Sequence, residues 1–101
     1  MHQDVAFRDW YIDRVRHIRQ ITPRQAEAIY LVRCGLSNER IAELMGICVN
    51  TVKSHLQAVF RSLHVGTRAE LVAEIDDTLG LNGETDHDPA DRPPRAKNSS
   101  D

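Results

Sequence analysis

Four polar side chains are spaced so that together they can read the edges of DNA bases. Asn50, Lys53, Ser54 and Gln57 recur at steps of three, one and three residues, which places them on one face of a helix. Their amide, ammonium and hydroxyl groups suit hydrogen bonding to base edges in a major groove. A solvated face usually mixes Glu with Lys at i,i+4 spacing, and this stripe has no carboxylate. Simple exposure to solvent is the alternative interpretation.

The residues between these positions are apolar and define the opposite face of the same helix. In the stretch VNTVKSHLQAVFRSL, residues 49 to 63, the side chains expected inside are Val52, Leu56, Val59, Phe60 and Leu63. We therefore predict an amphipathic helix here, with residues 49–62 as its DNA-reading part.

The preceding segment contains a dense helix start. Thr22 and Gln25 form a Thr-x-x-Gln capping box, and Pro23 suits the first helical position. Ile21 stands where it can pack against the first turn of this helix, and Gly35 is expected to end it.

A second, shorter helix then leads into the amphipathic one. Ser37 is placed to cap it and Gly46 to end it, with Ile41, Ala42, Leu44 and Met45 expected inside. A glycine-containing turn of three residues would then join two helices, which is the helix-turn-helix pattern.

A further helix is expected from a second capping box, Thr67 to Glu70, to a point near Gly80, with Leu71, Val72 and Ile75 inward. We expect residues 81–101, which are rich in Pro, Asp, Asn and Ser, to form a disordered tail. The chain thus divides into an N-terminal amphipathic helix (1–20), a helix-turn-helix domain (21–80) and that tail.

The N-terminal helix, expected over about residues 4–20, carries most of the aromatic residues. Phe7, Tyr11, Val15 and Ile18 recur at helical spacing, and Trp10 lies beside that stripe. Either this helix packs on its own domain, or its aromatics form a dimer or partner surface. On the second interpretation, deleting residues 1–19 would weaken a dimer and leave the fold intact.

Charge and composition exclude several classes of protein. The net charge of −2 is not that of a typical nucleic-acid binder, but residues 44–69 contain no Asp or Glu. Lys53, Arg61 and Arg68 make that stretch locally positive. The two cysteines and five histidines lack metal-ligand spacing, so no metal or cofactor is expected. No signal peptide or membrane span is evident, which favours a cytoplasmic protein.

Several motifs in register resemble LuxR/FixJ/GerE-type helix-turn-helix domains. They are ITPRQAEAIYLV, GLSNERIAELMGI, TVKSHLQAVFRSLHV and TRAEL, and the resemblance covers roughly residues 21 to 79. The resemblance implies an all-α, four-helix bundle that binds DNA as a dimer, with its third helix in the major groove and its fourth at the dimer seam. We expect a stand-alone, GerE-like member, here preceded by an extra N-terminal amphipathic helix.

The resemblance also assigns roles to individual residues. Base contacts match Lys53, Ser54 and Gln57, to which the polar stripe adds Asn50. Phosphate contacts match Ser37, Asn38, Thr51, His55 and Arg61, and Arg40 adds a charge nearby. The dimer seam is expected at Ala69, Ala73, Asp76 and Leu79, enlarged by Trp10, which we expect to become less exposed in the dimer.

Four positions depart from the usual family pattern. Cys48 replaces a Ser that commonly caps the recognition helix, and Arg40 replaces a Glu that would complete a capping box with Ser37. Ser62 stands where Lys is frequent, and Arg33 where a small residue is usual.

The sequence therefore predicts a sequence-specific transcription regulator that binds pseudo-palindromic DNA as a homodimer. One alternative is a sigma region-4-like module that docks on RNA polymerase. Another is a protein-interaction module that sequesters a regulator. An enzyme is not expected, because no nucleophile–base pair, phosphate loop or carboxylate dyad is evident, and no small-molecule ligand is suggested.

Overall fold

The computed structural model describes residues 5–18 and 20–81. Within these ranges the secondary structure is helical throughout: α1 (Val5–Val15), α2 (Pro23–Arg33), α3 (Asn38–Met45), α4 (Val49–Leu63) and α5 (Arg68–Thr78). The all-α class is thereby confirmed, as is the extra helix before the helix-turn-helix bundle. The expected tail lies almost entirely outside the described residues.

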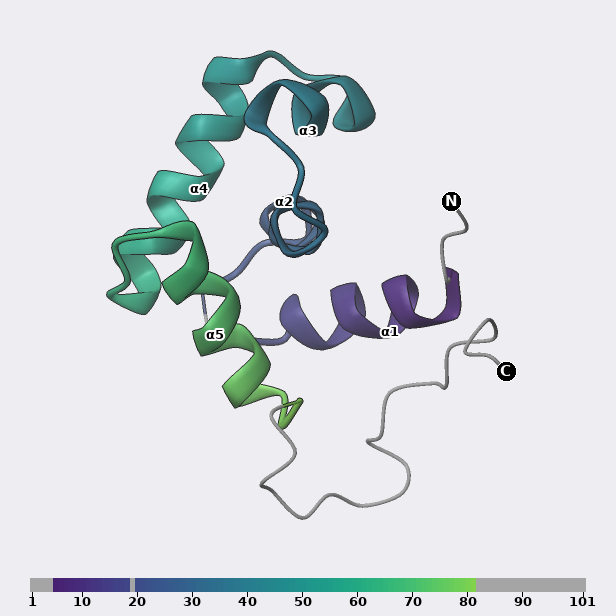
Figure 1. The fold of residues 1–101 in the computed structure, drawn as a ribbon, viewed down its shortest axis with the longest axis vertical. Coiled ribbons are helices and arrows are strands. Elements are labelled where there is room, and N and C mark those ends of the chain that lie inside the picture. The colour runs from purple at the N-terminus through teal and green to yellow at the C-terminus, as the bar shows by residue number, and fades with distance from the viewer. Residues whose placement is uncertain (1–4, 19, 82–101) are drawn as a thin grey trace.

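Helix α2 is the centre of the bundle. It is seen end-on in Figure 1, and it packs against each of the other four helices. The largest side chains that are fully buried come from every helix: Tyr11, Val15, Ile29, Ile41, Val52, Val59, Leu71 and Ile75. A small, mainly aliphatic core with two tyrosine rings, Tyr11 from α1 and Tyr30 from α2, therefore holds the described chain together.

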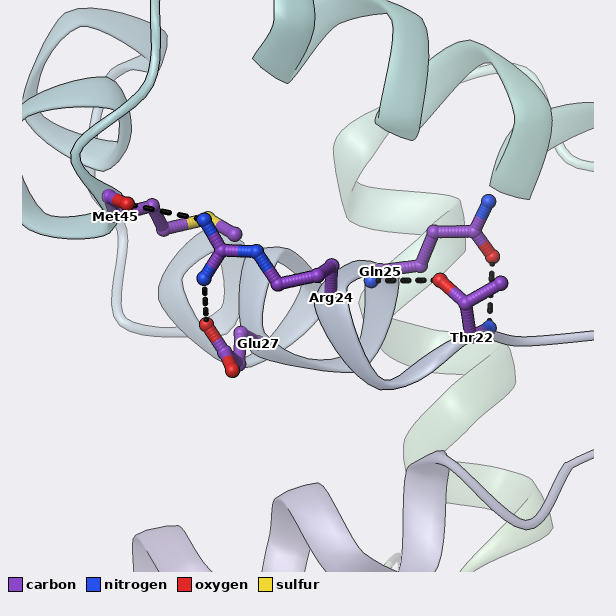
Figure 2. A network of polar contacts seen from close by, with 5 residues as sticks. All are labelled: Thr22, Arg24, Gln25, Glu27 and Met45. Carbon is purple, nitrogen blue, oxygen red and sulfur yellow. Dashed lines mark hydrogen bonds and ion pairs between the residues drawn. The ribbon is translucent and has the colours of Figure 1, made fainter.

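The predicted start of α2 is confirmed atom by atom. The Gln25 backbone N–H donates to Thr22 Oγ1 at 3.1 Å, and the Thr22 N–H donates to Gln25 Oε1 at 3.0 Å (Figure 2). This reciprocal pair satisfies two N–H groups that a helix start otherwise leaves without partners. Gly35 follows the helix with a φ of 84°, in the left-handed region that favours glycine.

The capping of α5 departs from the expected reciprocal box. Thr67 Oγ1 accepts from the Glu70 N–H at 3.0 Å, as predicted. The Glu70 carboxylate, however, reaches one residue further back and accepts from the Gly66 N–H at 2.7 Å. Only half of the box is formed, because the carboxylate satisfies a loop donor instead of the Thr67 N–H.

Helix α1 ends at Val15, earlier than the expected end near residue 20. The Arg16 N–H still reaches Ile12 O, but His17 and Ile18 donate to carbonyls only three residues back, so the chain tightens into a turn. Tyr11 and Val15 are fully buried in the common core. Helix α1 therefore supplies part of that core, and the expectation that the fold stays intact without residues 1–19 remains a prediction.

Leu44 is a second correction, because its side chain is 53% exposed rather than inward. Ile41 and Ala42 fill the interface of α3 with the bundle, and Met45 is half-buried. Leu44 lies beside that interface, at the edge of a cleft between α1, α2 and the end of α3.

Candidate nucleic-acid interface

Helix α4 separates its apolar and polar side chains as the sequence predicts. Val52, Leu56 and Val59 are buried against the bundle. The four side chains assigned to base contacts are all exposed: Asn50, Lys53, Ser54 and Gln57. The helix therefore presents a polar stripe without carboxylates to solvent, while contact of that stripe with bases remains a prediction.

The turn before α4 is closed by backbone bonds. Gly46 adopts the left-handed conformation, with φ 70° and ψ 35°, and the Ile47 N–H donates to Ala42 O at 3.0 Å. This is the arrangement that ends a helix at glycine and satisfies its last carbonyls. The turn joins α3 to α4 within three residues. We call the two helices and this turn, residues 38–63, the helix-turn-helix corner.

Arg24 of α2 binds the end of α3 in this helix-turn-helix corner. Its Nη2 donates to the backbone carbonyl of Met45 at 3.0 Å, and its Nη1 pairs with Glu27 Oε1 at 2.7 Å (Figure 2). A cation is favourable at this point, because unpaired carbonyls give a helix C-terminus a partial negative charge. Sequence reasoning noted Arg24 only as part of a motif and did not find this role.

Arg68, the first residue of α5, fastens the other end of α3. One guanidinium nitrogen donates to Asn38 Oδ1 at 2.9 Å, and the other donates to the backbone carbonyl of Leu36. Both bonds join residues about thirty positions apart in the sequence, so no local sequence pattern could predict them. Helix α3 is thus held by an arginine at each end.

The residues predicted to contact phosphate at the start of α3 are already engaged within the protein. Ser37 is exposed, and its Oγ accepts from the Arg40 N–H at 3.2 Å, so the predicted cap is confirmed. The exposed Arg40 guanidinium pairs with Glu43 on the next turn. That pair is solvent-accessible and weak, so phosphate can compete for the guanidinium.

The remaining predicted phosphate contacts lie along α4. Arg61 is exposed in the last turn, whereas Thr51 and His55 are half-buried. Cys48 occupies the N-cap and makes no side-chain bond to a helix N–H, as expected for sulfur. Its Sγ lies 3.2 Å from Thr51 Oγ1, and this hydrogen bond lowers the pKa of the exposed Cys48 thiol.

The predicted dimer seam is only partly exposed. Ala69 and Ala73 lie on the outer surface of α5, while Leu79 is half-buried against the core. The expectation that Asp76 is exposed is wrong, because its carboxylate binds Arg33 of α2 and is only 15% exposed. Trp10 is half-buried beside Phe7, with ring centroids 5.9 Å apart.

The cleft beside Leu44 contains none of the predicted DNA contacts. It has a volume of about 590 Å³, and Ile12, Leu31 and Tyr30 lie among its lining residues. Its rim includes neighbouring charges that pair with each other, such as Asp13 with Arg16 at 3.2 Å. Burial raises the pKa of Tyr30 to about 12, so this phenol is neutral at physiological pH.

The described residues hold neither a metal-binding cluster nor a membrane span. Across residues 5–18 and 20–81, no group of three or more His, Cys, Asp or Glu side chains is arranged to hold a metal ion. Nor does any helix in those ranges combine the length and apolarity needed to cross a bilayer.

Comparison with known proteins shows that the sequence of this chain is similar to those of transcription regulators. The family model described as sigma-70, region 4, matches residues 16–63. The chain is 38% identical over 58 residues to the tetrathionate response regulatory protein TtrR of Salmonella typhimurium, covering 57% of this chain and 28% of that protein. It is 37% identical over 59 residues to the CsgBAC operon transcriptional regulatory protein of Escherichia coli, covering 58% and 27%.

A third relative extends the comparison to a much larger regulator. The HTH-type transcriptional regulator MalT of Vibrio cholerae is 30% identical over 63 residues, covering 62% of this chain and 7% of MalT. The chain therefore spans less than a third of the length of each of these relatives. No solved structure matches it significantly.

Helices α3 and α4 with the turn between them form a helix-turn-helix, and the proteins to which this chain is similar are transcription regulators, which indicates the class of helix-turn-helix transcription regulators. Within that class, these comparisons support the resemblance of residues 21–79 to helix-turn-helix domains of the LuxR/GerE type.

Proposed function

We propose that this chain is a sequence-specific transcription regulator that binds pseudo-palindromic double-stranded DNA in the cytoplasm as a homodimer. Helix α4 enters the major groove in this proposal, and its exposed residues contact base edges. The observation that carries it is the polar stripe of α4, which is free of carboxylates and lies directly opposite a fully apolar face.

The charge around α4 supports the same assignment. No Asp or Glu occurs from residue 44 to residue 69, and Lys53 and Arg61 are both exposed. DNA affinity rests largely on neutralising phosphate charge, which acidic side chains beside the reading helix would oppose. A module that only sequesters another regulator would have no need to exclude carboxylates there.

A dimer follows from the limited reach of one helix. A single recognition helix reads only a few base pairs, whereas two related by a two-fold axis read half-sites about 34 Å apart. We place the seam on the exposed face of α5, around Ala69 and Ala73. That face is small, so we expect a weak dimer in solution and a firm one on DNA.

The match to the sigma-70 region 4 model favours a second candidate, a module that reads a promoter element while docked on RNA polymerase. Both candidates use the same helix-turn-helix corner, so the fold alone does not separate them. Their DNA targets differ in symmetry, because a dimer requires two inverted half-sites and a docked monomer requires one.

Selection of bound sequences from a random DNA pool tests both candidates. Recovered sites with inverted repeats about one helical turn apart would support the proposal. An asymmetric single element, bound more tightly when RNA polymerase is added, would support the second candidate instead. Uniform binding with no enriched sequence would contradict both.

A further inference from the structure

Arg68 and Asn38 form a contact between the start of α5 and the start of α3. Arg68 Nη1 donates to Asn38 Oδ1 at 2.9 Å, and its Nη2 donates to the carbonyl of Leu36. Both residues are half-buried, and the two guanidinium nitrogens are used in different directions. Arg68 is therefore committed within the protein and is poorly placed to reach a phosphate itself.

This contact fixes the orientation of the Asn38 amide. A guanidinium has only donors, so the Asn38 atom that faces it must be the carbonyl oxygen. The Nδ2 group lies on the other branch of the same planar amide and points away from Arg68. An asparagine without such a neighbour can present either atom, because its two ends differ little in size.

The orientation of the Asn38 amide matters because Asn38 lies at the start of α3, where other hydrogen-bond donors are grouped. Asn38 is the first residue of α3, directly after the Ser37 cap, and Ser37 Oγ is occupied by the Arg40 N–H. By helix geometry, the N–H groups of Asn38 and Glu39 have no acceptor within the helix. The Asn38 Nδ2 group, which makes no hydrogen bond to any other described residue, is a third donor at this helix start, and donors grouped there favour an anion.

We propose that Arg68 is a positioning residue for DNA binding, which holds Asn38 so that its Nδ2 donates to a backbone phosphate. This inference rests on the proposed function and names a residue outside the expected contact set. Arg68 acts through Asn38, while its bond to Leu36 holds α5 against the turn between α2 and α3.

A double-mutant cycle on DNA affinity tests the coupling. Arg68→Met and Asn38→Ala are made singly and together, and binding to one selected DNA site is measured. The Arg68–Leu36 bond is lost both in the Arg68→Met single variant and in the double variant. Its effect on affinity therefore cancels in the cycle. We expect Arg68→Met to weaken binding about threefold or more when Asn38 is present, as for residues in direct contact, and much less in the Asn38→Ala background.

The dependence of affinity on salt distinguishes positioning from direct phosphate contact. Arg61→Met is the matched control, because it removes one positive charge from an exposed site on α4. A direct phosphate contact lowers the salt slope by about 1. We expect that decrease for Arg61→Met and a smaller one for Arg68→Met. Equal decreases, or equal weakening by Arg68→Met with and without Asn38, would overturn the proposal.

A measurement on the free protein separates this inference from the proposed function. NMR relaxation of the Asn38 side-chain amide reports its order without DNA, and we expect that order to fall in Arg68→Met. If the wild-type chain bound no DNA, the proposed function would fail while this result could still stand. If Arg68→Met does not fold, Arg68→Ala replaces it, since it also removes both donors, and an unchanged Asn38 amide would then contradict the inference.

Discussion

The Arg33 guanidinium donates two hydrogen bonds to the Asp76 carboxylate, from Nε to Oδ1 at 3.1 Å and from Nη2 to Oδ2 at 3.2 Å. The Tyr11 hydroxyl donates to the same Oδ1 at 3.3 Å. The guanidinium carbon also lies 5.3 Å from the ring centroids of both Phe7 and Tyr11. One carboxylate thus joins α1, α2 and α5.

We expect Asp76→Ala to lower the free energy of unfolding by about 1–3 kcal/mol, because it leaves a partly buried guanidinium and a buried hydroxyl without their acceptor. Glu74→Ala, on the exposed side of the same helix, is the control and should change stability by less than about 0.5 kcal/mol. Denaturant unfolding measures both. Equal effects would show that the network adds no stability.

Cys48→Ser should stabilise the domain. Cys48 is exposed, so a serine hydroxyl at this N-cap pays no burial cost and can accept from an N–H that sulfur leaves without a side-chain partner. The expected gain is up to about 1 kcal/mol, seen as a higher melting midpoint. Cys34→Ser, at the exposed C-cap of α2, should change the midpoint little. A lower midpoint for Cys48→Ser would refute the capping argument.

Stability should fall as pH rises above about 10, the ordinary pKa of tyrosine. Burial raises the pKa of Tyr30 to about 12 and raises the pKa of Tyr11 as well. Above pH 10 the unfolded chain loses these protons first, so the native state binds more protons and unfolding is favoured. Each tyrosine contributes a slope of up to about 1.4 kcal/mol per pH unit until its folded pKa is reached.

Tyr11→Phe provides the control for that slope. This variant loses the bond to Asp76 and should be less stable at neutral pH. Its stability should nevertheless decline less steeply between pH 10 and 12, because only Tyr30 then carries a raised pKa. Unfolding curves at successive pH values test this, and parallel declines in the two proteins would exclude Tyr11 as a source of the pH dependence.

Lys53 and Arg61 are a matched pair for testing DNA readout, since both are exposed cations on α4. Lys53→Ala should cost about 1–3 kcal/mol on the selected site and flatten the preference at one position of each half-site. Arg61→Ala should weaken all sequences alike and reduce the salt slope by about 1. Specificity left intact by Lys53→Ala would mean that α4 is oriented differently on DNA.

Ala73→Glu tests the seam without disturbing the core, because Ala73 is exposed on α5. A carboxylate on each side of a two-fold interface repels its counterpart, so the dimer dissociation constant should rise while the fold is kept. Sedimentation on DNA with two half-sites, compared with a single half-site, measures this. An unchanged dimer would move the seam elsewhere on the molecule.

Local signals in the sequence predicted local structure well. The Thr22–Gln25 box, the Ser37 cap and the face of α4 each depend on residues within one or two turns, where helical periodicity relates sequence directly to position. They were correct for that reason.

Contacts between distant residues were not predicted. Tyr11 meets Asp76 across 65 residues, and Arg33 meets it across 43. No periodicity links such positions, and a charged residue on a helix reads as exposed until its partner is known. Arg33 appeared only as an unusual residue, and Asp76 was placed on the wrong surface for this reason.

The two arginines that hold α3 bear on how new DNA specificities can be engineered. Arg24 and Arg68 both bind main-chain carbonyls, those of Met45 and Leu36. A backbone carbonyl is present whatever side chain the residue carries. These two hydrogen bonds therefore tolerate substitution of Met45 and Leu36. Randomising the exposed residues Asn50, Lys53, Ser54 and Gln57 leaves both of these carbonyls and the buried face of α4 in place, so most variants in such a library should fold.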